Sequence, residues 1–471
     1  MPSRANSNQI KPREWQIQLV NLLKRRVISS LEKDILVHAG PGAGKTIGAL
    51  LGFNALRNEF YLEKFLVFCH RGSIANQWYE ASKKLKLKSI IVDISKLKNL
   101  NRNSFDGLIF TYQGCSKNLK EIKDELNLLN WTKTLSIADE VHHLGLDPEE
   151  PEGAIWGKNF INLTKKSALR IGLTGTPFRA DNLAFCSGRK IIIQEKDQVT
   201  EQITPDICIE PKDLISAGDV RPLEFHFQDG SVEYRKEGNH EKEKSNISEE
   251  VRTSWRASNL RKAISLKEES GIALQLLLRT KNKLDQIRLF QKNAAGLVIA
   301  RDIEHAESIS KFLIQSGDQV ELVHSQQKDA GKRLSAFQEN SKNWLVSIDM
   351  CSEGFDAPRI RVVAYLTCVV TKSRFIQAIT RSVRIGTTNI TKESIPRRPS
   401  YVFAPADPLL MEYAKNWSTT QPYLIRNNQV LTEPKNHSWI PKGPTLPMEA
   451  VNEEIGKIIK MRTTQLPNFL H

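Results

Sequence analysis

The sequence lacks paired cysteines, long apolar runs and an apolar segment near its start. The six cysteines are scattered with no CxxC pair, which excludes a zinc ribbon and a disulfide framework as the basis of the fold. No stretch reaches the roughly 18 consecutive apolar residues of a membrane span, and residues 1–15 hold no apolar core of a signal peptide. These absences predict a soluble cytoplasmic protein with reduced thiols and no membrane partner.

The composition is that of a globular, basic protein. The chain has 471 residues, which is enough for two or three domains at roughly 150 residues each, and 40% of them are hydrophobic. The 68 Lys and Arg residues outnumber the 53 Asp and Glu residues and give a net charge of +15. An excess of this size indicates a polyanionic partner, and nucleic acid is the one we expect.

Short apolar runs of strand length alternate with amphipathic stretches of helix length. This alternation is typical of parallel sheets covered by helices, so the sequence predicts an α/β fold with two such domains. The expected strands of the first domain are residues 35–38, 65–69, 89–94, 107–111, 134–138 and 170–173. Those of the second domain are residues 296–300, 320–324, 344–348, 361–366 and 401–403.

These patterns divide the chain into four segments. Residues 1–194 and 246–421 are the two predicted domains, 195–245 are a connector, and 422–471 are a tail. The connector is turn-rich and charged without a sustained apolar period, which favours a solvated linker. Prolines interrupt the tail except near Met448–Met461, where we expect a short helix.

A phosphate-binding pattern lies at residues 34–53, where an apolar strand is followed by a Gly-rich turn and a helix. The backbone N–H groups of such a turn wrap phosphates, and the helix N-terminus adds positive potential. Lys45 can reach the β and γ phosphates, and Thr46 can hold Mg²⁺. Ala39 departs from the pattern, because the first glycine is usual there. The predicted ATP site comprises Gly40, Gly42, Ala43, Gly44, Lys45 and Thr46.

Two adjacent acids, Asp139 and Glu140, follow the expected strand at 134–138, at the end where α/β sheets place their ligands. Asp139 can hold Mg²⁺, while Glu140 can orient and deprotonate the attacking water. Neighbours on an extended segment point to opposite faces, and no Cys or third His is near in the sequence. We therefore interpret His142 as a hydrogen-bonding relay rather than as half of a metal site with His143.

The order of these segments resembles the superfamily II helicases and translocases, the DExD/H-box motors built from two RecA-like domains. AGPGAGKT resembles motif I, and DEVH resembles motif II. PREWQ resembles the upstream element that recognises adenine, which implies that role for Arg13 and Gln16. LTGTPFR resembles motif III, which implies that Thr174 and Thr176 couple the nucleotide state to domain movement.

Two further segments resemble the motifs that touch nucleic acid in this family. FCHRGSIANQW resembles motif Ia and FTYQ resembles the motif after it, which implies contacts from Arg71, Gln77 and Thr111. Lys83 and Lys84 open a basic stretch after motif Ia. That stretch can meet phosphates, but a solvated helix face explains it equally well.

The second half continues the resemblance. GLVIARDIEHA resembles motif IV, and SEGFDAP resembles motif V, which implies that Gly354 and Asp356 lie at the nucleotide. QAITRSVR resembles motif VI, with Thr380 in place of the usual glycine. A helix there would place Gln377, Arg381 and Arg384 on one face, where all three can point at one nucleotide.

The resemblance implies a fold and a mechanism. We expect ATP and Mg²⁺ to bind in a cleft between two tandem RecA-like domains, and closure of the cleft to accompany hydrolysis. The style of motifs III and V resembles the DNA-directed branch of XPB-like repair helicases, phage branch-migration helicases and restriction-enzyme motors. A helicase or translocase on duplex or branched DNA is therefore favoured, serving a partner nuclease or a repair or defence complex. Two alternatives stay open: an RNA helicase, and a nucleotide-gated DNA clamp that recruits a partner nuclease.

Overall fold

The structure is a computed structural model of the full chain. It describes residues 11–29, 32–92, 101–128, 131–145, 152–175, 190–195, 198–236, 242–266, 271–324, 326–348, 355, 357–386, 397–417, 424–425 and 448–462. These residues fall into two compact units. The first runs to Ile209 and the second begins at Glu210, while residues 424–425 return to the first unit.

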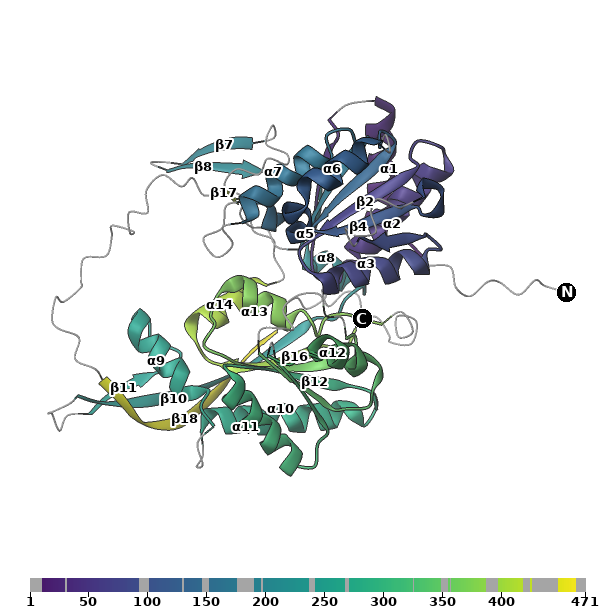
Figure 1. The fold of residues 1–471 in the computed structure, drawn as a ribbon. Helices are drawn as coiled ribbons and strands as arrows, with labels where there is room; N and C mark the ends of the chain where they lie inside the picture. Colours follow the sequence, from purple (N-terminus) through teal and green to yellow (C-terminus); the bar gives the residue numbers. More distant parts are fainter. Residues whose placement is uncertain are drawn as a thin grey trace, which may run out of the picture. The chain divides into compact units, whose positions relative to one another are not determined.

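Unit 1 is built on a sheet whose seven strands are all parallel (Figure 1). Their order is β3-β4-β2-β5-β6-β1-β9. Its strands are β1 (Asp34–Ala39), β2 (Lys64–Cys69), β3 (Ser89–Ile91), β4 (Gly107–Thr111), β5 (Thr134–Asp139), β6 (Leu169–Thr174) and β9 (Ile207–Ile209). The six strands expected in this half are therefore confirmed, although β3 ends three residues earlier than expected.

The helices of unit 1 form two groups. Their bounds are α1 (Glu14–Ser29), α2 (Lys45–Asn58), α3 (Gly72–Lys84), α5 (Tyr112–Lys117), α6 (Leu119–Leu128) and α7 (Gly153–Leu163). Short 3₁₀ turns are η1 (Arg102–Ser104) and η2 (Val141–Leu144). The crossovers through α2 and α3 run along the sheet in one direction and those through α5 to α7 in the other. Because such crossovers are right-handed, the two groups cover opposite faces.

A small antiparallel sheet also lies in unit 1, in the order β17-β8-β7. Its strands are β7 (Lys190–Glu195), β8 (Gln198–Ile203) and β17 (Leu424–Ile425). The sequence predicted a connector from residue 195, but β8 and β9 extend the regular structure of unit 1 to Ile209.

Unit 2 is built on a second sheet with the order β11-β10-β16-β15-β12-β14-β13, and β18 pairs with β10 beside this path. Its strands are β10 (Leu223–Lys236), β11 (Lys242–Asn246), β12 (Ala295–Ala300), β13 (Val320–Val323), β14 (Trp344–Ser347), β15 (Ile360–Leu366), β16 (Ser400–Pro405) and β18 (Met448–Arg462). Its helices are α8 (Pro211–Ser216), α9 (Thr253–Ala263), α10 (Ile272–Arg288), α11 (Ile303–Gln315), α12 (Ala330–Glu339), α13 (Lys372–Ile379) and α14 (Pro408–Asn416). The five strands expected in this half are confirmed.

Strand β10 corrects the prediction of a solvated linker. Leu223, Phe225 and Phe227 alternate along it and are fully buried, and their segment pairs in parallel with β16. The distal half of β10 pairs with β11, and the register with β18 shifts between Gln228 and Gly230. The alternation was hidden in the sequence because the turn-like residues 229–231 fall inside the strand.

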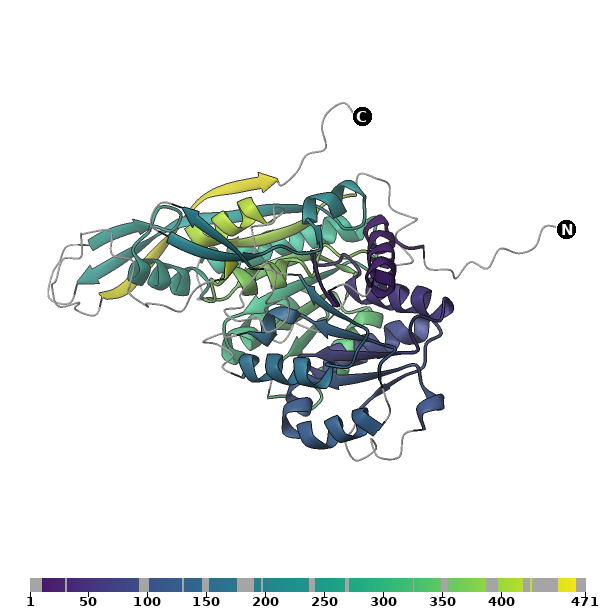
Figure 2. The ribbon, with the colours of Figure 1, turned by 90° about the horizontal axis from the view of Figure 1, so that it is seen from above.

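Strand β18 corrects the prediction of a helix near Met448–Met461. This segment runs antiparallel to β10, and Figure 2 shows it in yellow along the teal strand. Phe227 pairs with Ile459, and Phe225 pairs with Met461. The charge pattern of the segment suits a helix, but pairing with a strand more than 200 residues away in the sequence decides its structure. Within the described residues, no helix is both long and apolar enough to cross a membrane.

Candidate nucleotide site

The carboxyl edge of the unit 1 sheet gathers most of the predicted residues of the first half. Because all the strands are parallel, their carboxyl ends meet at one edge. Strand β5 is central, with β2 and β4 on one side and β6 and β1 on the other. In sheet order, the residues at or just after the strand ends are Thr111, Arg71, Asp139 with Glu140, Thr174 and Ala39. The predicted nucleic-acid contacts and the predicted ATP site therefore flank the acid pair on opposite sides.

Side chains at the start of helix α1 and directly before it bind the backbone carbonyls of the Gly-rich loop. The Arg13 guanidinium donates to the Gly42 carbonyl (2.7 Å), the Trp15 indole to that of Ala43 (3.0 Å), and the Gln16 amide to that of Gly44 (3.0 Å). The loop turns through left-handed backbone at Gly42 and Gly44, which glycine adopts without strain. Helix α2 begins directly after it at Lys45. These contacts show Arg13 and Gln16 shaping the loop, and their part in adenine recognition stays a prediction.

Lys45 and Glu140 face one another across the edge of the sheet. The Lys45 ammonium lies 3.7 Å from a Glu140 carboxylate oxygen and donates to the Ala39 carbonyl at 3.2 Å. The Glu140 backbone is left-handed, with φ of 50°, which is strained for a residue other than glycine. Its second carboxylate oxygen accepts the Gly175 N–H at 3.4 Å. A strained backbone thus directs the Glu140 side chain towards the phosphate-binding loop.

Asp139 is buried and held by three hydrogen bonds. The Trp78 indole donates to one carboxylate oxygen (2.6 Å), the Glu140 N–H donates to the other (3.1 Å), and the Tyr112 hydroxyl donates to the Asp139 carbonyl (2.8 Å). Burial and the nearby Glu140 charge raise the pKa of Asp139 to about 6, against the opposing effect of Trp78 and Lys45. A buried carboxylate whose charge is disfavoured suits a cation, and its oxygen, like the Thr46 hydroxyl, is a donor that Mg²⁺ prefers.

The histidines after the acid pair correct the geometry expected from the sequence. Val141–Leu144 form a 3₁₀ turn instead of an extended segment, and the rings of His142 and His143 lie close together, with centroids 4.3 Å apart. His142 Nδ1 lies 3.2 Å from the Thr174 hydroxyl and 3.4 Å from the Glu140 carboxylate. No cluster of metal-ligating side chains occurs in the described part of the chain. Thr176 lies outside the described residues.

The predicted nucleic-acid contacts do not form one cluster. Arg71 is exposed at the N-cap of α3, and the Thr111 hydroxyl caps α5 by accepting the Gly114 N–H at 3.1 Å. Gln77 lies near the middle of α3 and is half-buried. Lys83 and Lys84 are exposed in the last turn of α3, roughly 18 Å along the axis from Arg71 at a rise of about 1.5 Å per residue. They therefore lie towards the opposite edge of the sheet.

Motif VI, in unit 2, also differs from expectation. Helix α13 ends at Ile379, so Gln377 is helical while Arg381 and Arg384 lie beyond the helix and do not share one helical face with it. The Arg381 N–H bonds to the Ala378 carbonyl in a tighter turn (3.3 Å). The Arg381 side chain is buried and donates to the Phe355 carbonyl of motif V (2.6 Å). Gly354 and Asp356 lie outside the described residues.

Buried Arg221 anchors the end of motif VI. Its guanidinium donates to the Arg384 carbonyl (2.5 Å) and to the Pro358 carbonyl (3.2 Å), and its own N–H donates to the Val383 carbonyl (2.8 Å). The Thr380 hydroxyl, at the position where glycine is usual, donates to the Ile376 carbonyl (2.6 Å). The backbone around Arg384 is therefore fixed to the segment that follows motif V.

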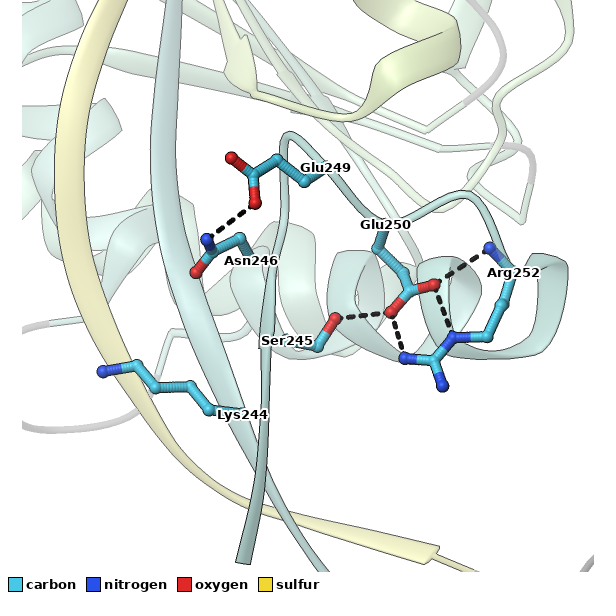
Figure 3. A pocket seen from close by; sticks show the side chains of 6 residues that line it. All are labelled: Lys244, Ser245, Asn246, Glu249, Glu250 and Arg252. Atoms are coloured by element: carbon cyan, nitrogen blue, oxygen red, sulfur yellow. Dashed lines mark hydrogen bonds and ion pairs between the residues drawn. The ribbon is translucent and has the colours of Figure 1, made fainter.

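A polar pocket of about 400 Å³ lies elsewhere on unit 2 (Figure 3). Arg252 donates to both carboxylate oxygens of Glu250 (2.8 and 2.7 Å), and the Ser245 hydroxyl donates to one of them (2.7 Å). These bonds, chiefly those from Arg252, hold the pKa of Glu250 at about 2. None of the predicted site residues lines the pocket. Its side chains are Lys244, Ser245, Asn246, Glu249, Glu250 and Arg252.

Three residues of the site were missed by sequence reasoning. Trp15 lies in the PREWQ motif and Trp78 in the FCHRGSIANQW motif. A tryptophan on an amphipathic helix is equally expected to pack in the hydrophobic core, so neither motif indicates a hydrogen bond from its indole. Tyr112 directly follows Thr111, and a strand-end tyrosine gives no indication that its hydroxyl bonds to a residue 27 positions away. Only the three-dimensional packing identifies their partners.

Comparisons with known proteins follow the same two-unit division. Residues 9–179 match the family model of the type III restriction enzyme res subunit, and residues 279–386 match the helicase conserved C-terminal domain. An uncharacterized protein of Mycobacterium leprae is 26% identical over 422 residues, which are 88% of this chain and 64% of the relative. The chain thus spans less than two thirds of that relative's length.

Two solved structures share the fold. A fragment assigned as an HsdR subunit of a type I restriction enzyme from Vibrio vulnificus is 17% identical with a TM-score of 0.53, over 89% of this chain and 68% of that one. The ATP-dependent type ISP restriction-modification enzyme LlaBIII bound to DNA is 14% identical with a TM-score of 0.52, over 84% of this chain and 28% of that one. The expected pair of tandem RecA-like domains is confirmed.

The chain is a member of the superfamily II helicases. Its match to a restriction-enzyme subunit is carried by residues 9–179.

Proposed function

We propose that the chain is an ATP-dependent helicase or translocase that acts on duplex or branched DNA. The proposal is supported mainly by the residues at the carboxyl edge of the unit 1 sheet. There Lys45 lies 3.7 Å from Glu140, and Asp139 beside it is bonded to the helix that begins after Arg71. The proposed nucleotide site at Lys45 and the basic residue Arg71 therefore lie at the same edge of the sheet, and Asp139 and Glu140 lie between them.

The binding roles follow from the chemistry of the residues. The backbone N–H groups of residues 40–44 and the start of α2 receive the phosphates, and the Lys45 ammonium leaves Glu140 for the β and γ phosphates. Asp139 and the Thr46 hydroxyl hold Mg²⁺. When bound, the ion neutralises charge on the β- and γ-phosphate oxygens.

The hydrolytic roles fall to both units. Glu140 orients the attacking water and accepts its proton. His142 lies between Glu140 and Thr174. A change at the Glu140 carboxylate can therefore alter the position of Thr174 in motif III through His142. Gln377 and Arg384 are proposed to reach the nucleotide from unit 2, with Arg384 as the candidate arginine finger. The buried Arg381 ties motif VI to motif V instead. If each unit also binds the DNA backbone, alternating closure and opening of the cleft would move one unit along the DNA relative to the other.

The net charge indicates a nucleic acid, and two further observations favour DNA. The net charge of +15 suits a polyanion, and the family model of residues 9–179 is that of a restriction-enzyme subunit. The similar LlaBIII structure was determined bound to DNA. We therefore propose that a partner nuclease, or a repair or defence complex, uses the movement.

The test measures ATP turnover on single-stranded, duplex and forked DNA and on matched RNAs, with Lys45→Ala as the inactive control. We expect the largest stimulation with duplex or forked DNA. Stimulation by RNA alone would make the chain an RNA helicase, and no stimulation by any nucleic acid would overturn the proposal.

A triplex-displacement assay separates a motor from a clamp. A motor that tracks along duplex DNA displaces the third strand in an ATP-dependent manner. Turnover stimulated by DNA without displacement, together with nucleotide-dependent binding, would identify a nucleotide-gated clamp instead.

A further inference from the structure

Asp139 is held from the side of the sheet that carries the predicted nucleic-acid contacts. Its carboxylate accepts the Trp78 indole N–H at 2.6 Å, and its backbone carbonyl accepts the Tyr112 hydroxyl at 2.8 Å. Trp78 comes from α3, which follows β2, and Tyr112 is the first residue of α5, which follows β4. Both strands lie on the side of β5 away from the phosphate-binding loop.

Each of these rings adjoins a residue predicted to contact nucleic acid. Trp78 directly follows Gln77 in α3, and Tyr112 directly follows Thr111, the N-cap of α5. A displacement of either helix on binding a backbone must therefore move a side chain that is bonded to Asp139.

Both rings are buried in close packing, so their polar atoms cannot turn to water. Trp78 is 0% exposed and Tyr112 is 2% exposed. The Tyr112 ring is stacked on that of Trp156, with centroids 5.9 Å apart. Buried hydrogen bonds are directional and costly to lose, and the Trp78 bond to the Asp139 carboxylate is also charge-assisted, so both connections are stiff.

We propose that Trp78 and Tyr112 are positioning residues that transmit nucleic-acid binding at α3 and α5 to Asp139, and so control how well Asp139 holds the catalytic metal ion. The inference rests on the proposed function and deepens it, because it assigns the coupling between the two ligands to two particular hydrogen bonds. Neither ring touches the nucleotide in this role.

The coupling must be reciprocal. If nucleic acid improves the position of Asp139 for Mg²⁺-nucleotide, then Mg²⁺-nucleotide raises the affinity for nucleic acid by the same factor. Factors of about 5 to 150 are typical for such couplings. Loss of the Trp78 hydrogen bond should reduce this factor towards one.

The test uses Trp78→Phe and Tyr112→Phe in the full chain, each of which removes a donor and keeps an aromatic ring. Trp131→Phe is the matched control, because Trp131 is buried in the same core cluster as Tyr112 and its indole nitrogen has no hydrogen-bond partner among the described residues. The first readout is binding of fluorescent duplex DNA with and without Mg²⁺ and a non-hydrolysable ATP analogue. The second is the affinity for Mn²⁺ in the presence of that analogue, measured by electron paramagnetic resonance.

We expect Trp78→Phe to weaken Mn²⁺ binding at least about fivefold and to lose most of the coupling factor, with Tyr112→Phe intermediate and Trp131→Phe like wild type. Wild-type coupling and Mn²⁺ affinity in a folded Trp78→Phe protein would overturn the inference. Equal losses in Trp131→Phe would also overturn it, because they would reflect general loosening of the core.

Different results would overturn the proposed function and the coupling through Trp78 and Tyr112. If the wild-type protein shows no nucleic-acid stimulation at all, the proposed function fails, whereas the Mn²⁺ measurement still tests the hydrogen bonds. If wild type is stimulated and the variants keep its coupling, only the inference fails. Thermal melting of each variant identifies any that do not fold, and Tyr112→Phe tests the second bond if Trp78→Phe is among them.

Discussion

Gly175 lies against the end of Lys45: a Cβ atom added at Gly175 would be 2.7 Å from the Lys45 Nζ. The same added atom would lie 3.6 Å from the Ala39 carbonyl oxygen and 4.0 Å from the Glu140 carboxylate. The absence of a side chain at Gly175 therefore gives the ammonium its place between the loop and the acid. This position, directly after β6, is one where any other residue would disturb the site.

Gly175→Ala should impair turnover much more than folding. The alanine methyl displaces the Lys45 ammonium, which can move because it ends a flexible chain, so the cost falls on catalysis. We expect ATP turnover to fall at least about tenfold, equivalent to about 1.4 kcal/mol in the activation barrier, with a nearly unchanged melting temperature. Gly331→Ala is the control, since a Cβ there meets nothing within 4 Å. Equal activities in the two variants would show that the Lys45 position is not restricted.

Glu140→Gln should separate binding from hydrolysis. The amide keeps the shape of the side chain and leaves Asp139 and Thr46 to hold the metal, but it cannot accept the proton of the attacking water. General bases contribute about 10² to 10⁴ in rate, so we expect a loss in this range with near-native affinity for Mg²⁺-ATP. Single-turnover hydrolysis and equilibrium nucleotide binding provide the two measurements. Normal hydrolysis with normal binding would exclude Glu140 as the base.

Asp139→Asn should stabilise the protein in the absence of divalent cations at neutral pH. Burial raises the pKa of Asp139 to about 6, above its value in the unfolded chain, so the folded state favours the protonated carboxyl. The contribution of the protonated Asp139 carboxyl to the free energy of unfolding is fully present below about pH 4 and is lost as the pH rises through about 6. The asparagine variant mimics the neutral form and keeps that stability.

Thermal melts in EDTA at several pH values measure this effect. The melting temperature of Asp139→Asn should exceed that of wild type at about pH 7.5, and the difference should shrink towards zero near pH 4. Adding Mg²⁺ with nucleotide should stabilise wild type and not the variant. A variant less stable than wild type at neutral pH would mean that the ionised carboxylate is well accommodated without a metal.

The sequence predicted the elements whose signal is local. The strand that ends at Asp139 and the loop that ends at Lys45 are defined by an apolar run and by glycines, and both were placed within a residue or two. Strand β10 was missed because its burial depends on β16 and β18, which are far away in the sequence. Helix α13 ends at Ile379, and the chain then turns with the Arg381 N–H bonded to the Ala378 carbonyl. The prediction that a helix carries Arg384 was wrong because such a turn gives no clear sequence signal. The pairing of strands that are distant in the sequence and the ends of helices could therefore not be predicted from the sequence alone.

Arg381 and Arg384 differ in burial and in the contacts that hold them. Arg381 donates to the Phe355 carbonyl and is buried, so it ties motif VI to motif V. Arg384 is only half-buried, and it is the backbone carbonyl of this residue that Arg221 anchors. An arginine with a fixed backbone and a more accessible side chain is the better candidate for the finger that stabilises the transferring phosphoryl group.

Arg384→Ala should therefore keep its melting temperature and its affinity for ATP and DNA, yet lose at least about 100-fold in DNA-stimulated turnover, a cautious bound on the 10³ to 10⁵ of comparable fingers. Arg381→Ala should instead lower the free energy of unfolding by about 1 to 3 kcal/mol, because it leaves the Phe355 carbonyl without its donor. Denaturant unfolding and steady-state ATPase assays on both variants distinguish the two roles. If Arg384→Ala hydrolyses ATP within a few-fold of wild type while Arg381→Ala is stable and inactive, the assignments are reversed. If both retain turnover, closure of unit 2 onto the nucleotide is not part of the mechanism.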